Sequence, residues 1–141
     1  MNIIFICKHN VFRSRVAEAV FKKYYKGSKY KAKSRGIFPG DYVYKNTIRS
    51  VKSIGYNIKG MPKELRYEEL QVPNIIVVVA DDVPKNLFSR YKKIHKLIKW
   101  NFPDTDQGDT KSIQRISKNI ESKVKSFAKR LKWNLKQKDW Y

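Results

Sequence analysis

Hydrophobic residues along this chain form short continuous runs that alternate with stripes at helical spacing. Residues 3–6 and 75–79 are continuous apolar runs, and the second is rich in β-branched side chains, which predicts a strand buried on both faces. Weaker strand patterns lie at 30–34 and 94–98. Because strands buried on both faces are typical of parallel sheets, these segments predict a parallel sheet of four strands.

Stripes of apolar residues at helical spacing fill the intervals between the predicted strands. The spacing predicts helices over 13–25 and 46–54, and a long final helix that begins near Ser112. Shorter helical segments are predicted over 67–70 and 84–91. Strands that alternate with helices predict an α/β fold, a doubly wound parallel sheet of four strands with helices on both faces.

The length of 141 residues suits one domain, and no linker or internal repeat interrupts the pattern, so we expect a single domain over 1–141. A hydrophobic share of 41% is typical of a folded protein. No stretch reaches the ~20 apolar residues of a membrane span, and the first apolar run is too short for a signal peptide, so no membrane partner is expected. The lone cysteine, Cys7, suits a reducing cytoplasm. One cysteine and two histidines give no metal-ligand cluster, so we expect no metal and no cofactor.

Positive charge dominates the composition: 32 Lys and Arg against 12 Asp and Glu give a formal net charge of +20. Such a surplus attracts polyanions by counterion release, so nucleic-acid binding and the steering of acidic phosphopeptides are two functional interpretations. The other interpretation is a lysine-rich, solvated surface. The basic residues are spread along the whole chain without a basic motif, so we expect the solvated surface, with non-specific affinity for polyanions as a consequence.

The clearest chemistry lies in one segment, whose sequence is Cys7-Lys8-His9-Asn10-Val11-Phe12-Arg13-Ser14. It begins where the first predicted strand ends and finishes where the first helix begins. Loop N–H groups and the positive end of a helix bind oxyanions, and Arg13 adds a planar fork of donors for two phosphate oxygens. The positive potential of these groups favours the thiolate of Cys7 over its thiol, and Ser14 can donate a hydrogen bond to the thiolate. The alternative is a buried cysteine that fills core space, with Arg13 on a solvated helix face.

The spacing Cys-x5-Arg-Ser between a strand and an amphipathic helix resembles the phosphate-binding loop of the low-molecular-weight protein tyrosine phosphatases. That family also contains phosphatases that act on phosphoarginine and the thioredoxin-coupled arsenate reductases. The resemblance implies that Cys7 is the nucleophile and that Arg13 is catalytic. It implies a phosphate site made of Lys8, His9, Asn10, Val11, Phe12, Arg13 and Ser14. Asn10 would hold the loop open through a left-handed backbone conformation.

An acidic loop at 100–109 lies between the last predicted strand and the last helix, at the carboxyl edge of the sheet. The resemblance implies that one aspartate of this loop protonates the leaving group and then activates water. Asp104 is the first choice because it follows an aromatic-proline pair, and Asp106 is the alternative. Asp109 suits capping of the last helix. A loop of purely solvated and capping carboxylates is the other interpretation.

Three positions depart from the family pattern. His9 stands where a glycine is usual, so either the loop is reshaped or His9 simply points to solvent. Phe12 replaces the second cysteine that many members use to trap an oxidised nucleophile. The tyrosine pair that often follows the acid is missing. The candidate wall of a phenyl slot is therefore aromatic residues after the second strand, namely Phe38, Tyr42 and Tyr44, with ordinary packing as the alternative.

These observations predict a metal-independent cysteine phosphatase that hydrolyses phosphomonoesters through a cysteinyl-phosphate intermediate. Protein phosphotyrosine is the expected substrate, because a deep loop excludes short phosphoserine side chains and Val11 stands where phosphoarginine-specific relatives prefer threonine. The partner would be a phosphorylated protein or a small phosphomonoester. One alternative is an arsenate reductase that uses an external thiol, since Cys7 is the only cysteine. The other is a noncatalytic phosphate- or polyanion-binding module.

Overall fold

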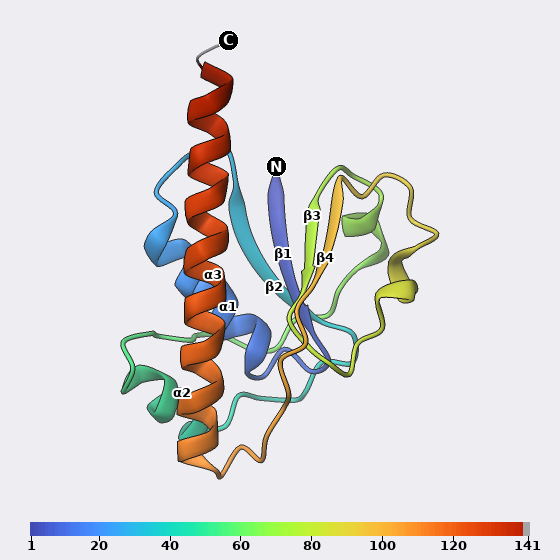
Figure 1. Cartoon of the computed structure of the whole chain (residues 1–141). Coiled ribbons are helices and arrows are strands. Elements are labelled where there is room, and N and C mark those ends of the chain that lie inside the picture. The colour runs from blue at the N-terminus through green and yellow to red at the C-terminus, as the bar shows by residue number, and fades with distance from the viewer. Residues whose placement is uncertain (140–141) are drawn as a thin grey trace.

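A parallel four-stranded sheet forms the centre of the computed structural model, which describes the backbone of residues 1–139 and the side chains of residues 1–132 (Figure 1). Its strands are β1 (Asn2–Cys7), β2 (Lys31–Gly36), β3 (Ile75–Val78) and β4 (Lys96–Lys99). Their order in the sheet is β2-β1-β3-β4, and every neighbouring pair is parallel. The predicted α/β class, built on four parallel strands, is confirmed.

Two α-helices and two short 3-10 helices connect the strands, and a third α-helix follows β4. They are α1 (Arg13–Tyr24), α2 (Lys45–Lys52), η1 (Tyr67–Leu70), η2 (Lys85–Phe88) and α3 (Thr110–Asp139). Figure 1 shows the three α-helices on one side of the sheet and both 3-10 helices on the other. The helical segment predicted over 84–91 is reduced to the single turn of η2, in which only Phe88 is buried. No helix within the described residues is long and apolar enough to cross a membrane.

Apolar side chains bury both faces of the central strands. Every residue of β3 is buried, as its β-branched run predicts, and residues 3–6 of β1 are fully excluded from solvent. On the helical side, Phe5 contacts Phe21 of α1 and Phe127 of α3, with ring centroids 5.9 and 6.5 Å apart. The core therefore fixes α1, which begins at the end of the candidate loop, directly against β1.

The order of the strands creates a crevice at the carboxyl ends of β1 and β3. The connection after β1 leads to β2 on one side of β1, and the next connection leads to β3 on the other side. β1 ends at Cys7, which pairs in register with Gly36, the last residue of β2. On its other side, Ile6 pairs with Val78, the last residue of β3. Cys7 therefore lies where the ends of three strands meet.

Candidate functional site

The loop between β1 and α1 turns its carbonyl groups away from the pocket that it surrounds. Three successive carbonyls accept hydrogen bonds from the segment that follows β2. The pairs are Ile37 N–H to Cys7 O at 3.2 Å, Phe38 N–H to Lys8 O at 2.8 Å, and Gly40 N–H to His9 O at 2.9 Å. None of the backbone N–H groups of residues 8–12 donates a hydrogen bond in the described part of the chain, so these groups are available to an anion, as in an anion-binding nest.

Cys7 lies at the base of this loop and is 2% exposed. Its Sγ is 3.0 Å from the Oγ of Ser14, which is fully buried in the first turn of α1. A hydroxyl at this distance can donate a hydrogen bond to a thiolate. The sulfur, the loop and the helix start are thus brought together as the sequence spacing predicts.

Asn10 holds the loop in shape with its backbone and its side chain. It has a φ of 53° and is the only residue other than glycine, among those described, with positive φ, a conformation that Asn tolerates better than most residues. Its Nδ2 donates to Ser14 Oγ at 2.8 Å, and its Oδ1 accepts from the Lys63 N–H at 2.8 Å. His9 does not adopt positive φ, so histidine in place of glycine brings no backbone strain here; its Nδ1 hydrogen-bonds the Phe38 carbonyl at 2.7 Å.

Arg15 supports the loop from below, a role that the sequence pattern did not reveal. Its side chain is buried, its Nε donates to the Asn10 carbonyl at 2.6 Å, and an Nη donates to the Lys59 carbonyl at 2.7 Å. Burial lowers the pKa of Arg15 from its ordinary value, which the nearby charges of Glu18 and Cys7 oppose. A buried cation directly behind the loop adds positive potential to the pocket that the loop surrounds.

Gly36 allows the end of β2 to approach the loop closely. A Cβ built at Gly36 would lie 2.9 Å from the backbone nitrogen of Asn10 and 2.9 Å from the carbonyl carbon of His9. Because both neighbours are backbone atoms, they cannot move aside without displacing the loop. The glycine after the second strand is therefore a steric requirement of the candidate site.

We expect Gly36→Ala to destabilise the protein by about 1–3 kcal/mol, because the methyl group overpacks against the loop backbone. Urea unfolding monitored by tryptophan fluorescence measures this loss. Gly108→Ala is the matched control, since its added Cβ would meet only a side-chain oxygen of Asp106, at 3.0 Å, and no backbone atom. Equal unfolding midpoints for the two variants would contradict the steric explanation.

Arg13 is 2% exposed, and its positive charge is balanced by ion pairs with a group of carboxylates. One Nη donates to both oxygens of Asp82, at 3.0 and 3.2 Å. The other Nη donates to the Phe102 carbonyl at 2.9 Å and to Asp81 at 3.4 Å. Asp104 completes the group, with its Oδ2 3.7 Å from the guanidinium. Asp82 is a residue that the sequence analysis missed, although its place four residues after the end of β3, next to Asp81, was the available signal.

The three aspartates of the acidic loop differ in where their carboxylates lie. Asp104 lines the pocket and accepts a hydrogen bond from the Thr105 N–H at 2.9 Å. Asp106 is outside the lining and accepts from the Gly108 N–H at 2.7 Å. Asp109 caps α3 by accepting from the N–H and Oγ of Ser112 at 3.0 and 2.7 Å, and these hydrogen bonds lower its pKa. The capping interpretation of Asp109 is confirmed.

Gln107 connects this loop to α2. Its Oε1 accepts from the Oγ1 of Thr47, a fully buried residue of α2, at 2.7 Å. Its Nε2 donates to the Thr105 carbonyl at 2.8 Å and lies 3.5 Å from Asp104 Oδ1. Asn46 adds a hydrogen bond to the Gln107 carbonyl at 2.9 Å. The sequence analysis found none of these contacts, which join segments about 60 residues apart.

These elements enclose a pocket of about 330 Å³. Its lining includes Cys7, His9, Val11, Phe12, Arg13, Tyr42, Tyr44, Asp104 and Gln107. Tyr42 and Tyr44 pack edge to face with ring centroids 4.9 Å apart. Of the three aromatic candidates for a wall, these two line the pocket, whereas Phe38 is 67% exposed and does not. The pocket thus combines a buried thiol, a guanidinium and two carboxylates, Asp41 and Asp104, beneath an aromatic wall.

Comparison with known proteins adds to this geometry. The family model described as "Low molecular weight phosphotyrosine protein phosphatase" matches residues 2–137. A protein tyrosine phosphatase from Entamoeba histolytica is 23% identical, with a TM-score of 0.79 over 95% of this chain and 98% of its own.

Two further structures share the fold. YwlE arginine phosphatase from Geobacillus stearothermophilus is 16% identical, with a TM-score of 0.78 over 96% of each chain. An arsenate reductase from Archaeoglobus fulgidus is 22% identical, with a TM-score of 0.68 over 89% of this chain and 98% of its own. A search of curated proteins found no match.

Proposed function

This chain belongs to the low-molecular-weight phosphotyrosine protein phosphatase family, and we propose that it hydrolyses phosphomonoesters through a cysteinyl-phosphate intermediate on Cys7. The observation that carries the proposal is the position of the Cys7 sulfur: it lies at the base of a pocket, 3.0 Å from a serine hydroxyl and inside a loop whose carbonyls point outward. A single free thiol of this kind suits a reducing cytoplasm, where we propose that the protein works.

In the first step, the Cys7 thiolate attacks phosphorus and the bond from phosphorus to the leaving oxygen breaks. The N–H groups of residues 8–14 and the Arg13 guanidinium stabilise the charge on the three equatorial oxygens. In the second step, water attacks phosphorus, the sulfur–phosphorus bond breaks, and inorganic phosphate leaves. Ser14 stabilises the departing thiolate by hydrogen bonding, which its 3.0 Å distance from the sulfur supports.

We assign the proton transfers to Asp104. As an acid it protonates the leaving oxygen in the first step, and as a carboxylate it takes a proton from water in the second. Its place in the pocket lining beside Arg13 supports this role, and the position of Asp106 outside that lining argues against the alternative.

We expect Asp104→Asn to lower kcat by roughly 10²–10⁴-fold for phenyl phosphate, whose poor leaving group needs a proton, and by less for p-nitrophenyl phosphate. Asp106→Asn removes the same charge from the same loop and should leave both rates within about threefold of wild type, since its carboxylate is outside the pocket. Steady-state kinetics on the two esters measure both effects. A larger loss in the Asp106 variant would transfer the acid role to Asp106.

Phosphotyrosine is the substrate that we propose. Tyr42 and Tyr44 offer aromatic surface on which a phenyl ring can stack, and Val11 adds an apolar contact to the same pocket. Comparison of kcat/KM on matched peptides that carry phosphotyrosine, phosphoarginine or phosphoserine tests this choice. If kcat/KM were highest for the phosphoarginine peptide, phosphoarginine would be the substrate, and the proposed cysteinyl-phosphate mechanism would be unchanged.

The first experiment is hydrolysis of p-nitrophenyl phosphate in EDTA from pH 5 to pH 7.5. Turnover that is lost in Cys7→Ser supports a cysteine phosphatase that needs no metal. No turnover by wild type would overturn the proposal. Arsenate supplied with thioredoxin or another external thiol would then test the reductase alternative, because the chain has no second cysteine to complete a disulfide relay.

A further inference from the structure

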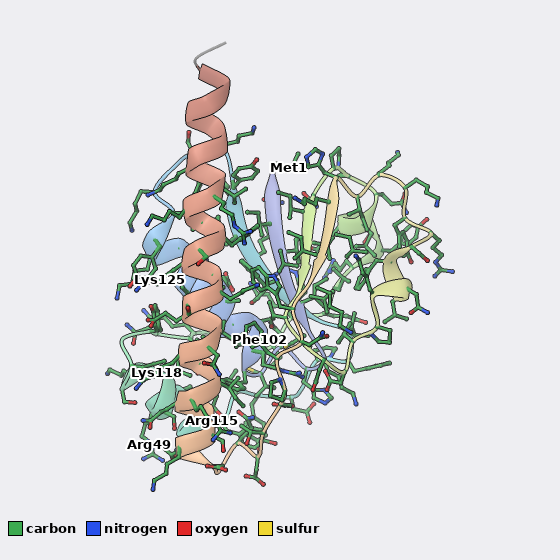
Figure 2. The ribbon with its side chains drawn as sticks, in the orientation of Figure 1. Met1, Arg49, Phe102, Arg115, Lys118 and Lys125 are labelled. Carbon is green, nitrogen blue, oxygen red and sulfur yellow. The ribbon has the colours of Figure 1, made fainter. Side chains whose placement is uncertain are left out.

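The outer face of α3 carries a continuous stripe of positive charge. Its six members are Lys111, Arg115, Lys118, Lys125, Lys129 and Lys132. Their spacings of three, four and seven residues place them on one side of the helix, and all six are exposed. Figure 2 labels Arg115, Lys118 and Lys125 along this helix. Although lysines are spread along the sequence, the fold therefore gathers a subset of them on one straight element.

The charge of this stripe is not neutralised within the described part of the chain. Between residues 110 and 132 the only acidic side chain of α3 is Glu121, and the hydroxyl of Tyr56 donates a hydrogen bond to it. None of the ion pairs formed by the described residues involves an α3 cation. Lys125 lies 4.6 Å from the centre of the Tyr24 ring, a contact that orders the ammonium group and leaves its charge in place.

A shallow groove of about 460 Å³ runs beside the stripe between α3 and the end of α1. Its lining combines ammonium groups with hydroxyl groups, from Tyr24, Ser122, Lys125, Ser126, Lys129 and Lys132. Ammonium and hydroxyl donors are the groups that proteins commonly use to hold phosphate oxygens without reading a base sequence.

We propose that this face of α3 binds the sugar–phosphate backbone of double-stranded nucleic acid. The stripe from Lys111 to Lys132 extends over ~32 Å of helix, which is close to the ~34 Å of one turn of a B-form duplex. A rigid row of cations of this length matches the phosphates that a duplex presents along one turn. The proposal is independent of the phosphatase activity proposed above.

Other polyanionic partners fit this surface less well. Among the described residues, the exposed large hydrophobic side chains lie outside α3, and Lys125 covers the one aromatic ring of the groove, that of Tyr24. The stripe therefore lacks the row of free aromatic rings on which single-stranded bases stack. For the same reason residues 110–132 have no apolar anchor that could enter a lipid interface. Contact through phosphates alone suits a duplex.

Fluorescence anisotropy with a labelled 24-base-pair DNA at 50–200 mM salt tests the proposal. For wild type we expect log K to fall with log salt with a slope of about −5, from about six released counterions. The variant Lys118→Gln/Lys129→Gln/Lys132→Gln should reduce that slope by about 3 and weaken binding at least tenfold at 50 mM salt. Glutamine preserves helix propensity, so the helix should remain intact.

The matched control is Lys85→Gln/Lys93→Gln/Lys96→Gln, which removes three exposed lysines from η2, β4 and the loop between them. In Figure 1, β4 is the edge strand of the sheet, and η2 lies on the side of the sheet away from α3. Its duplex affinity should stay within about threefold of wild type, and both variants should keep wild-type turnover of p-nitrophenyl phosphate, or wild-type melting temperature if that turnover is absent.

Equal losses in the two variants would overturn the proposal, since binding would then follow total charge. Tighter binding of single-stranded DNA of the same length, or of vesicles with 30% phosphatidylserine, would overturn the choice of duplex.

Discussion

Cys7→Ser should abolish hydrolysis of p-nitrophenyl phosphate, with a fall in kcat of about 10⁴-fold or more. A serine hydroxyl remains protonated in this pocket, and none of the carboxylates near Arg13 hydrogen-bonds the Cys7 sulfur to act as its base. The sulfur and oxygen side chains have nearly the same shape, so the buried end of β1 should still pack. The expected result is an inactive but folded protein.

Steady-state kinetics and thermal unfolding together check this expectation. The melting temperature should stay within a few degrees of wild type, and inorganic phosphate should still protect the variant against unfolding, because the loop amides and Arg13 are unchanged. Residual activity above one per cent of wild type, free of contaminating phosphatase, would mean that Cys7 is not the nucleophile.

Arg13→Ala should lower kcat/KM by about 10³-fold or more, the scale of a transition-state arginine. The guanidinium is the only buried cation in the pocket lining, and its orientation is fixed by Asp82 and the Phe102 carbonyl. Arg13→Lys should recover little of this loss, because an ammonium group is a point charge that cannot reach both partners and two phosphate oxygens together.

Arg35→Ala provides the comparison for Arg13. Arg35 also pairs with a carboxylate, Glu69 at 3.1 Å, but it lies outside the pocket lining. Loss of that pair should reduce stability and leave kcat/KM within about threefold of wild type. If the Arg35 variant lost as much activity as the Arg13 variant, the effect would be one of folding, and Arg13 would have no specific part in phosphate binding.

Local patterns made most of the fold predictable. The β-branched run at 75–79 became the central strand β3, and the apolar stripe after Ser112 became α3, because each pattern alone decides which faces must be buried. Boundaries were less accurate where packing decides them. β4 begins at Lys96, two residues after the predicted start, because its pairing with β3 begins there, with Lys96 opposite Ile75.

Parts of the site that depend on long-range contacts could not be read from the sequence. Arg15 and Gln107 gain their contacts only when the topology brings distant segments together, and Asp82, although it follows a strand end, gains its partner Arg13 in the same way. The loop of residues 7–14 was predictable because its chemistry is contained in eight consecutive residues. Contacts between residues that follow different strands leave no comparable motif in the sequence.

The hydrogen bonds of Gln107 have a kinetic consequence. They fasten the loop of Asp104 to α2, and α2 follows directly after the aromatic residues Tyr42 and Tyr44. The aromatic wall that we propose binds the substrate and the carboxylate that we propose transfers the proton are therefore held in one connected structure. We expect substitutions that widen the pocket for a bulkier substrate also to displace Asp104, so that KM and kcat change together among variants of this region.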